Sequence, residues 1–226
     1  MITTAMILAA GRGERLRPLT DSIPKPLVEV GGEPLICRHI RLLREAGIRT
    51  VVINTAWLGE KLEEALGDGS SFGVAIRWSR EIPGGLETAG GLRQALPLLG
   101  DRPFLTVNGD TFMDLDYRLF TAEDPRRGGA HLWLIPNPPH HPGGDFSLEG
   151  MRLLAAPGLT FSGAAVYSPS LIARIPEERL PLKPWILRWI AEGAATGEVL
   201  PGAWFDVGTM ERLAQVREYA SAGARF

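Results

Sequence analysis

The sequence predicts an α/β protein, a Rossmann-like three-layer α/β/α sandwich with a mostly parallel central sheet. Three short apolar runs carry this prediction, at 6–10, 50–54 and 103–107. Each run has the length of one strand, and the middle run is β-branched without polar alternation, as expected of a parallel strand covered on both faces. Segments with helical spacing separate the runs, which favours a parallel sheet with crossover helices.

In the N-terminal half, glycine and proline mark where the elements begin and end. Pro34 suits the first turn of a helix in which Ile36, Ile40 and Leu43 share one face, and Gly47 ends it. The predicted elements, in order, are strand 6–10, short strand 27–30, a helix from Pro34 to the Gly47 stop, strand 50–54, helix 58–66, strand 74–79, helix 88–98 capped by Thr88, and strand 103–107.

The C-terminal half continues the alternation around a long loop rich in proline and glycine. The helix predicted at 181–191 carries Trp185 and Trp189 on its apolar side, and tryptophans at this spacing favour core packing over a ligand platform. The predicted elements are helix 114–123, strand 130–135, loop 137–146, strand 159–167, helix 181–191 and a C-terminal helix capped by Thr209.

Composition excludes several classes of function. A chain of 226 residues fits one large domain or two small ones, and its 45% hydrophobic residues can bury a sizeable core; we expect a single domain spanning 1–226. A net charge of -2 gives no electrostatic case for nucleic acid. The only cysteine, Cys37, excludes an intramolecular disulfide, and it shares a helix with His39, where we expect a packed thiol and an ordinary imidazole. The chain has no signal-peptide pattern and no run long enough to span a bilayer, so we expect a soluble, cytoplasmic protein.

The most informative stretch lies between Gly11 and Lys25, which we call the cation loop. It follows the first strand and contains Arg12, Arg15, Arg17 and Lys25. Glycine lets backbone N–H groups approach an anion, and the cations supply charge, so the loop indicates phosphate binding. The alternative is a glycine turn followed by a proline-rich surface loop. A dinucleotide fingerprint is excluded because position 16 is leucine, and no Walker-type P-loop occurs.

The pattern Gly11-x-Gly13-x-Arg15-x-x-Pro18-x-Thr20, followed by Pro24-Lys25-Pro26-Leu27, resembles the signature of the sugar-1-phosphate nucleotidylyltransferases. The resemblance covers essentially the whole chain. It is closest to the N-acetylmuramate-1-phosphate uridylyltransferases of cell-wall sugar recycling, through the stretches 56–59, 86–88, 139–146 and 160–163.

This resemblance implies the nucleotide-diphospho-sugar transferase fold, with a mainly nucleotide-binding half at about 1–110 and a mainly sugar-binding half at about 111–226. It implies attack of N-acetylmuramate-1-phosphate on UTP, which releases pyrophosphate and gives a UDP-sugar. Some relatives carry a C-terminal left-handed β-helix, and we expect none here. Mannose-1-phosphate guanylyltransferase stays open as an alternative activity, and a non-catalytic sugar-nucleotide sensor as an alternative of another class. Oligomeric state stays open.

The resemblance also implies roles for single residues in nucleotide binding. Arg15 would hold the leaving β- and γ-phosphates, and Lys25 the α-phosphate or the sugar phosphate. Glu81 would accept from the base. The remaining implied nucleotide contacts are Ala10, Gly11, Gly13, Thr88, Gly90 and Asn108. Two positions depart from the family: Glu14 replaces Ser or Thr of many relatives, and Ala89 replaces a glycine.

A magnesium site is implied by two acidic residues that lie far apart in the sequence. Asp110 follows the strand 103–107 within Asn-Gly-Asp, at the end of a strand where open α/β sheets bind ligands. Asp206 precedes Val-Gly-Thr and resembles the family's second ligand of the same Mg²⁺. Mg²⁺ prefers oxygen ligands and keeps waters, so two carboxylates suffice. Taken singly, each aspartate also fits an ordinary turn.

The loop 137–146 is expected on the sugar side. His140 and His141 suggest a metal site, but no cluster of cysteine and histidine accompanies them, so we favour a substrate loop. The resemblance implies sugar or sugar-phosphate contacts from Gly144, Asp145, Ser162, Gly163 and Lys183.

Overall fold

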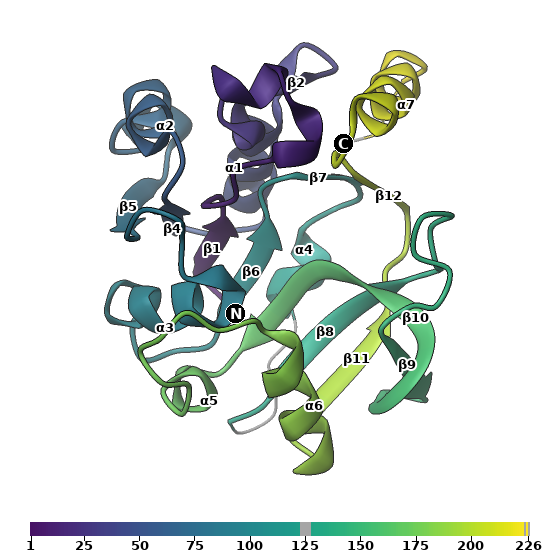
Figure 1. Ribbon diagram of the computed structural model, residues 1–226. Helices are drawn as coiled ribbons and strands as arrows, with labels where there is room; N and C mark the ends of the chain where they lie inside the picture. The colour runs from purple at the N-terminus through teal and green to yellow at the C-terminus, as the bar shows by residue number, and fades with distance from the viewer. Residues whose placement is uncertain (123–127, 224, 226) are drawn as a thin grey trace.

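The computed structural model spans residues 1–226 and describes all of them except 123–127, 224 and 226. Within the described residues, eight strands form one sheet in the order β11-β8-β10-β6-β1-β4-β5, with β9 beside β10 (Figure 1). Only β10 runs against the other strands of this sheet, as its antiparallel pairings with β6, β8, β9 and β11 show. The strands are β1 Thr4–Leu8, β4 Thr50–Thr55, β5 Ala75–Arg80, β6 Phe104–Asn108, β8 Ala130–Ile135, β9 Phe146–Glu149, β10 Arg152–Tyr167 and β11 Ala195–Val199.

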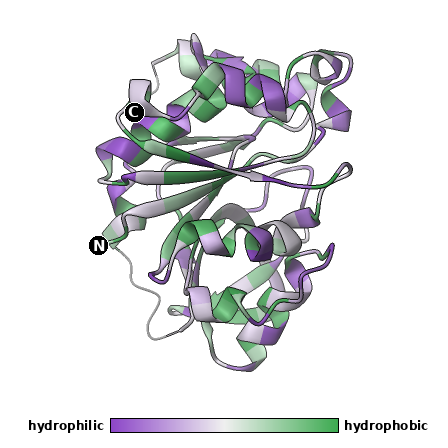
Figure 2. Cartoon of the chain, turned by 90° about the vertical axis from the view of Figure 1, so that its left-hand side faces the viewer, coloured by the Kyte–Doolittle hydropathy of each residue, from purple (hydrophilic) through white to green (hydrophobic). Residues whose placement is uncertain are grey.

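Helices cover both faces of this sheet, which confirms the predicted three layers (Figures 1 and 2). One face is covered by α1 Leu35–Glu45, α2 Gly59–Leu66 and α4 Arg118–Ala122, and the other by α3 Glu87–Leu99, α5 Pro169–Ile172 and α6 Lys183–Ala191. Ile7 and Ile53 belong to the first core and Met6 and Val52 to the second. Successive side chains of a strand point to opposite faces, and both faces are buried, so the apolar runs do not alternate with polar residues.

The parallel register brings polar residues to one edge of the sheet. Leu8 of β1 lies opposite both Asn54 of β4 and Asn108 of β6. The loops that follow these three strands therefore begin side by side, at the carboxyl edge where open α/β sheets bind ligands.

A smaller core holds the C-terminal helix against the cation loop. The helix α7 Met210–Ser221 packs through Leu213 and Val216 onto Leu16 of the cation loop. Two short two-stranded sheets accompany it, β2 Glu29–Val30 with β3 Glu33–Pro34, and β7 Thr111–Asp114 with β12 Ala203–Asp206. Helix α7 thus supports the loop that follows the first strand.

Three local predictions need correction. The strand predicted at 27–30 forms only at Glu29–Val30, because Lys25–Leu27 is a 3₁₀ turn. The segment predicted as helix 114–123 starts as the end of β7, and α4 begins only at Arg118; Glu123 lies outside the described residues. Thr88 is not a cap, since α3 begins at Glu87 and its N-cap Leu86 offers no side-chain acceptor. The cap at Thr209 is confirmed, as its side chain accepts from the Arg212 N–H. Across the described part of the chain, every helix is too short or too polar to cross a membrane.

Candidate functional site

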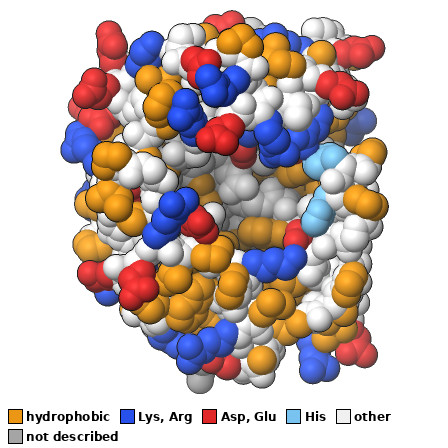
Figure 3. Space-filling view, in the orientation of Figure 1, with side chains coloured by type: hydrophobic (Ala, Val, Ile, Leu, Met, Phe, Trp, Pro, Cys, Tyr) orange, Lys and Arg blue, Asp and Glu red, His pale blue; other side chains and the backbone are white. Residues whose placement is uncertain are grey.

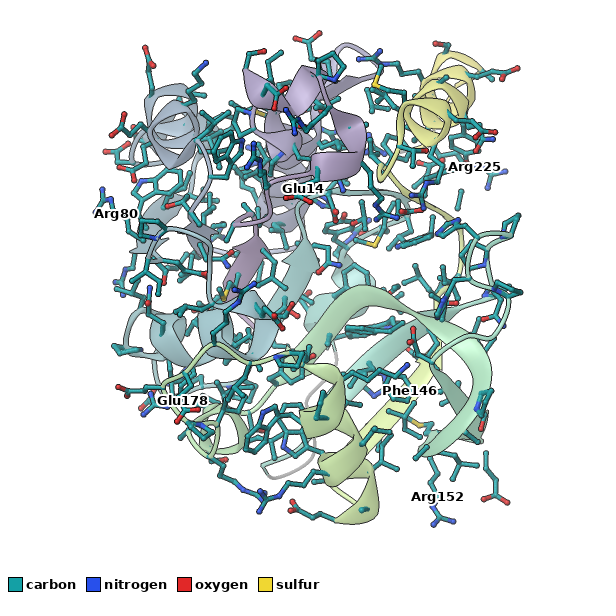
Figure 4. All side chains as sticks on the ribbon, in the orientation of Figure 1. Glu14, Arg80, Phe146, Arg152, Glu178 and Arg225 are labelled. Carbon is teal, nitrogen blue, oxygen red and sulfur yellow. The ribbon has the colours of Figure 1, made fainter. Side chains whose placement is uncertain are left out.

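A hollow opens on the face shown in Figure 3, with lysine and arginine side chains on its rim. The first cavity, of about 630 Å³, lies at the carboxyl ends of β1, β4 and β6 and includes Lys25 and Asp110. The second cavity, of about 400 Å³, includes Asp145 and Lys183. Both cavities are lined by Leu8, Glu87, Thr88 and Asn108, so they adjoin one another. Figure 4 labels residues on either side of the hollow, with Glu14 above it and Phe146 and Glu178 below.

Lys25 reaches the first cavity from a 3₁₀ turn, Lys25–Leu27, and its Nζ donates to the Asp110 carboxylate. The lysine is 7% exposed, whereas the Asp110 side chain is 39% exposed. Gly13 lets this arrangement form. Its φ is +68°, and a Cβ atom there would lie 3.2 Å from Lys25 Cδ, so a side chain at position 13 would crowd the lysine.

The turn that carries Asp110 is held on several sides. The Gly109 N–H donates to the Leu8 carbonyl at 2.9 Å, and the Val207 N–H to the Asp110 carbonyl at 2.9 Å. His39 Nε2 lies 2.8 Å from the Thr111 carbonyl oxygen. A carbonyl only accepts, so Nε2 carries the proton and Nδ1 accepts from the Tyr117 hydroxyl at 2.7 Å. His39 is therefore a core imidazole, as expected, that also fixes the backbone beside Asp110.

Burial decides the charge state of this imidazole. Desolvation lowers the pKa of His39 to about 4, against the opposing effect of the hydrogen bond to Thr111. The ring is thus neutral at neutral pH, which is the state that the Tyr117 and Thr111 contacts require.

Asp206 lies next to Asp110 in the backbone but points to other partners. Asp206 is opposite Thr111 in the β7–β12 pair. Its carboxylate accepts from Arg212 Nη1 at 2.5 Å and lies 3.3 Å from His140 Nε2. These three side chains line a third cavity, of about 360 Å³, and Asp110 is not part of its wall. Asp206 ends β12 and Asp110 directly precedes its partner strand β7, so the two carboxylates lie at the same end of this strand pair but engage different cations.

The donor set fits Mg²⁺ in its chemistry, because carboxylates are hard oxygen ligands and these two flank the β7–β12 pair. The described residues contain no group of three or more His, Cys, Asp or Glu placed to hold a metal ion. Water would have to complete the coordination, as is usual for Mg²⁺. The magnesium site stays a prediction.

Glu81 is part of a hydrogen-bonded chain along the first cavity. Asn54 Oδ1 accepts from the Ala9 N–H at 2.8 Å, and Asn54 Nδ2 donates to Glu81 Oε1 at 2.6 Å. Glu81 Oε2 accepts from the Leu86 N–H at 2.6 Å. Both carboxylate oxygens of Glu81 thus accept hydrogen bonds from the protein itself, and these bonds hold the loop 82–86 against β4. A contact from Glu81 to a base stays a prediction, and Asn54 is a site residue that sequence reasoning missed.

The structure brings some of the predicted nucleotide contacts to the first cavity and leaves others away from it. Those that line it are Ala10, Gly11, Lys25, Glu81, Thr88 and Asn108. Gly90 does not, because it is buried inside α3, where a Cβ would lie 2.3 Å from the Glu178 carbonyl oxygen. Gly90 allows close packing of the helix and that segment. Arg15 is exposed on the turn η1, Glu14–Leu16, and neither Arg15 nor Gly13 is part of the cavity wall.

Asp145 organises the second cavity. Its Oδ1 accepts from Lys183 Nζ at 2.8 Å, its Oδ2 accepts from the Phe161 N–H at 3.1 Å, and His141 Nε2 lies 3.4 Å away. Burial raises the pKa of the Asp145 carboxyl, but the bonds from Lys183 and Phe161 outweigh it, so the net shift is downward. Asp145 is therefore an anion tied to Lys183.

Three further residues predicted on the sugar side differ in their placement. Gly163 lines the second cavity. Ser162 is buried and donates to the Trp133 carbonyl at 2.7 Å, so its hydroxyl forms a hydrogen bond within the sheet. Gly144 has a φ of +64°, and a Cβ there would lie 2.6 Å from Asn137 Oδ1, so it shapes the loop. Sugar contacts from all three stay predictions.

The chain resembles known nucleotidyltransferases in sequence. Residues 4–141 match the family model described as Nucleotidyl transferase. The chain is 50% identical to an N-acetylmuramate alpha-1-phosphate uridylyltransferase of Neisseria meningitidis serogroup B, over 96% of this chain and 98% of the relative. It is 33% identical to the protein of the same name from Caulobacter vibrioides, over 90% and 91%.

More distant relatives and solved structures share the fold. A mannose-1-phosphate guanylyltransferase catalytic subunit beta of Danio rerio is 32% identical over 90% of this chain, which spans 61% of that relative. The structure of a putative glucose-1-phosphate thymidylyltransferase from Bacillus anthracis superposes with a TM-score of 0.85 at 21% identity, covering 96% of this chain and 94% of that one. At that identity the structural likeness supports the fold alone.

Proposed function

The chain belongs to the nucleotidyl transferase family, and from this membership we propose that it transfers a uridylyl group from UTP to N-acetylmuramate 1-phosphate. The choice of this substrate pair is supported by the relative with 50% identity over nearly the full length of both chains. UTP is a nucleotide of the cytoplasm, so this pair implies that the reaction takes place there.

The observation that carries the proposal is the pair of adjoining cavities with a cation at each. The first cavity holds Lys25 beside Asp110, and the second holds Lys183 beside Asp145. Asn108, Glu87 and Thr88 border both. A nucleotide in the first cavity and a sugar phosphate in the second would meet at this border, which is the geometry that a transfer between them requires.

In the proposed reaction, an oxygen of the sugar phosphate attacks the α-phosphorus of UTP. The new bond joins that oxygen to the α-phosphorus, and the bond from the α-phosphorus to the bridging oxygen breaks, so pyrophosphate leaves. A phosphate monoester dianion is already nucleophilic, so no general base is needed. Lys25 would neutralise charge on the α-phosphate as it builds.

We propose Mg²⁺ as the cofactor, with Asp110 and Asp206 as its protein ligands. When bound, the ion would neutralise phosphate charge and draw the two anionic substrates together. Binding would require Asp110 to exchange Lys25 for the metal, and Asp206 to exchange Arg212 or His140. The freed cations would then be available to the phosphates.

The test is pyrophosphate release from a panel of nucleoside triphosphates and sugar 1-phosphates with Mg²⁺, with each product identified by mass. We expect release with UTP and N-acetylmuramate 1-phosphate. Release with GTP and mannose 1-phosphate instead would replace the proposal by the activity named for the Danio rerio relative. Binding without release for every pair would favour a sensor.

A further inference from the structure

The cation loop is fastened to the segment that joins β4 to α2. Trp57 Nε1 donates to the Thr20 carbonyl at 3.0 Å. Thr20 Oγ1 in turn donates to the Gly13 carbonyl at 2.9 Å, inside the same loop. Lys61 Nζ, from α2, donates to the Ser22 carbonyl at 2.7 Å. Trp57 therefore holds one end of a chain of contacts that reaches the glycine beside Arg12.

The ring of Trp57 makes a second contact. The guanidinium carbon of Arg12 lies 4.3 Å from the centroid of that ring. Stacking on a ring uses the flat face of the guanidinium and leaves the in-plane N–H groups free to donate. Both residues line the first cavity, together with Lys25. Arg12 is thus an exposed cation whose one described contact, with the face of Trp57, leaves its donors open.

The charges of the loop single out Arg12 among its cations. Lys25 is neutralised by Asp110, and Arg17 pairs with Asp21 at 2.9 Å. Arg15 does not border the first cavity. Among the described residues, no carboxylate lies within ion-pair distance of Arg12. Arg12 is therefore the cation of the first cavity that has no carboxylate partner among the described residues. A polyphosphate anion would neutralise its charge.

We propose that Arg12, held in position by Trp57, binds the polyphosphate of the incoming nucleotide and the pyrophosphate that leaves. This inference rests on the proposed function, because it assigns a further residue to the same nucleotide cavity. Arg12 acts as a ligand of the phosphates. Trp57 acts through Arg12 and is a positioning residue.

The first test compares Arg12→Ala with Arg17→Ala, which removes the same kind of side chain from the same loop at a position that the structure places outside the first cavity and pairs with Asp21. The full-length variants are titrated with pyrophosphate and with UTP in the presence of Mg²⁺, by calorimetry. We expect Arg12→Ala to weaken both affinities by about tenfold or more, the loss typical of a charged hydrogen bond. Its KM for UTP should rise more than its KM for the sugar phosphate, and Arg17→Ala should match the wild type.

The outcomes separate this inference from the proposed function. Wild-type protein that binds neither UTP nor pyrophosphate would contradict the proposed function itself. If the wild type binds both and Arg12→Ala binds them equally well, the proposed function stands and the role of Arg12 is wrong. Equal losses in Arg12→Ala and Arg17→Ala would show a general charge effect and also overturn it.

The second test addresses Trp57 as a positioning residue. Trp57→Phe keeps an aromatic face and loses the indole N–H, whereas Trp57→Leu loses both. We expect Trp57→Phe to stay near wild-type pyrophosphate affinity, and Trp57→Leu to fall to the level of Arg12→Ala. The double variant should be no weaker than Arg12→Ala alone, because the second change removes an interaction that is already gone. Additive losses, or a loss in Trp57→Phe as large as in Trp57→Leu, would contradict positioning through the stacked guanidinium.

Discussion

Lys25 and Asp110 form an ion pair although 85 positions separate them in the sequence. The lysine side chain is 9% exposed and the aspartate side chain 39% exposed, so the pair presents mainly its carboxylate to the cavity. The two charges neutralise each other. A phosphate that enters the cavity can therefore be stabilised by Lys25 only if another cation replaces the lysine beside Asp110. In the proposed reaction, Lys25 and Asp110 would therefore exchange one another for the phosphate and the metal when these bind.

Removal of the lysine charge should abolish most of the activity and leave the fold intact. Lys25→Met keeps the aliphatic stem that packs beside Gly13, and Asp110 is exposed enough to be hydrated when unpaired. We expect turnover to fall by about 10²–10³-fold, the loss typical of one preorganised donor, with a melting temperature close to wild type. Pyrophosphate release per folded molecule measures this. Arg152→Met, at an exposed arginine of β10 outside the cavities, is the control for loss of a surface cation, and equal activity of the two variants would rule out a role for Lys25 in the transfer.

Turnover should require Mg²⁺, and the affinity for Mg²⁺ should depend on both Asp110 and Asp206. Chelation by EDTA should stop pyrophosphate release, and added Mg²⁺ should restore it. Asp110→Asn and Asp206→Asn keep the shape of each side chain but remove the charge, so each should raise the Mg²⁺ concentration needed for half-maximal turnover and lower the maximum. Asp116→Asn, at an exposed aspartate paired with Arg118, should behave as wild type. Turnover that resists EDTA, or an unchanged Mg²⁺ dependence in both variants, would refute the metal assignment.

His39 should make the protein less stable as the pH falls below neutral. The pKa of His39 is lowered from 6.5 to about 4 in the folded chain, so between these values the unfolded chain binds the extra proton. The stability contribution of the neutral ring is therefore fully present above pH 6.5 and is lost as the pH falls toward 4. Urea unfolding from pH 4.5 to 7.5 measures the slope.

The variant that isolates this effect is His39→Gln, which keeps a side-chain N–H donor near the Thr111 carbonyl and does not titrate. We expect its stability to depend less on pH than that of the wild type in the same window. Carboxylates such as Asp145, whose pKa is also lowered, contribute to both proteins and cancel in the comparison. His141→Gln, at a partly exposed histidine, is the control. Identical slopes in wild type and His39→Gln would show that His39 does not titrate as stated.

The layers of the fold were predictable because each long element carries its own signal. Buried parallel strands are continuous apolar runs, and α1 shows its buried face through Ile36, Ile40 and Leu43. The short strands β7 and β12 were missed because four residues are too few to establish a period. Their pairing also joins segments about ninety residues apart, and a local sequence pattern cannot indicate such a pairing.

The site was predictable where local chemistry decides it. Glycine and cations after β1 placed the cation loop, and the exit of β6 placed Asp110. The direction of the Asp206 side chain was not predictable, because Arg212 and His140 decide it from two separate segments. The occupied oxygens of Glu81 depend in the same way on Asn54, a residue from another strand. Sequence patterns indicate which residues gather at a site, whereas long-range partners decide which atoms stay free.

Gly163 should be required both for stability and for the position of Asn108. Its φ is +85°, and a Cβ atom there would lie 2.4 Å from Asn108 Nδ2. Gly163→Ala therefore meets an unfavourable backbone conformation and a side-chain collision, which together should destabilise the fold by about 1–3 kcal/mol. Asn108 borders both cavities, so its displacement should raise the KM for both substrates.

The two effects of Gly163→Ala can be separated by a second substitution. In the double variant Gly163→Ala with Asn108→Ala the collision is gone and the backbone strain remains, so the melting temperature should recover only in part. Gly143→Ala is the matched control, because a Cβ there meets no atom within 4 Å and its φ is not in the left-handed region. We expect Gly143→Ala to keep wild-type stability and KM. If Gly163→Ala equals this control in both measurements, the close approach of Gly163 to Asn108 is not needed for the site, and the border between the two cavities is set by other residues.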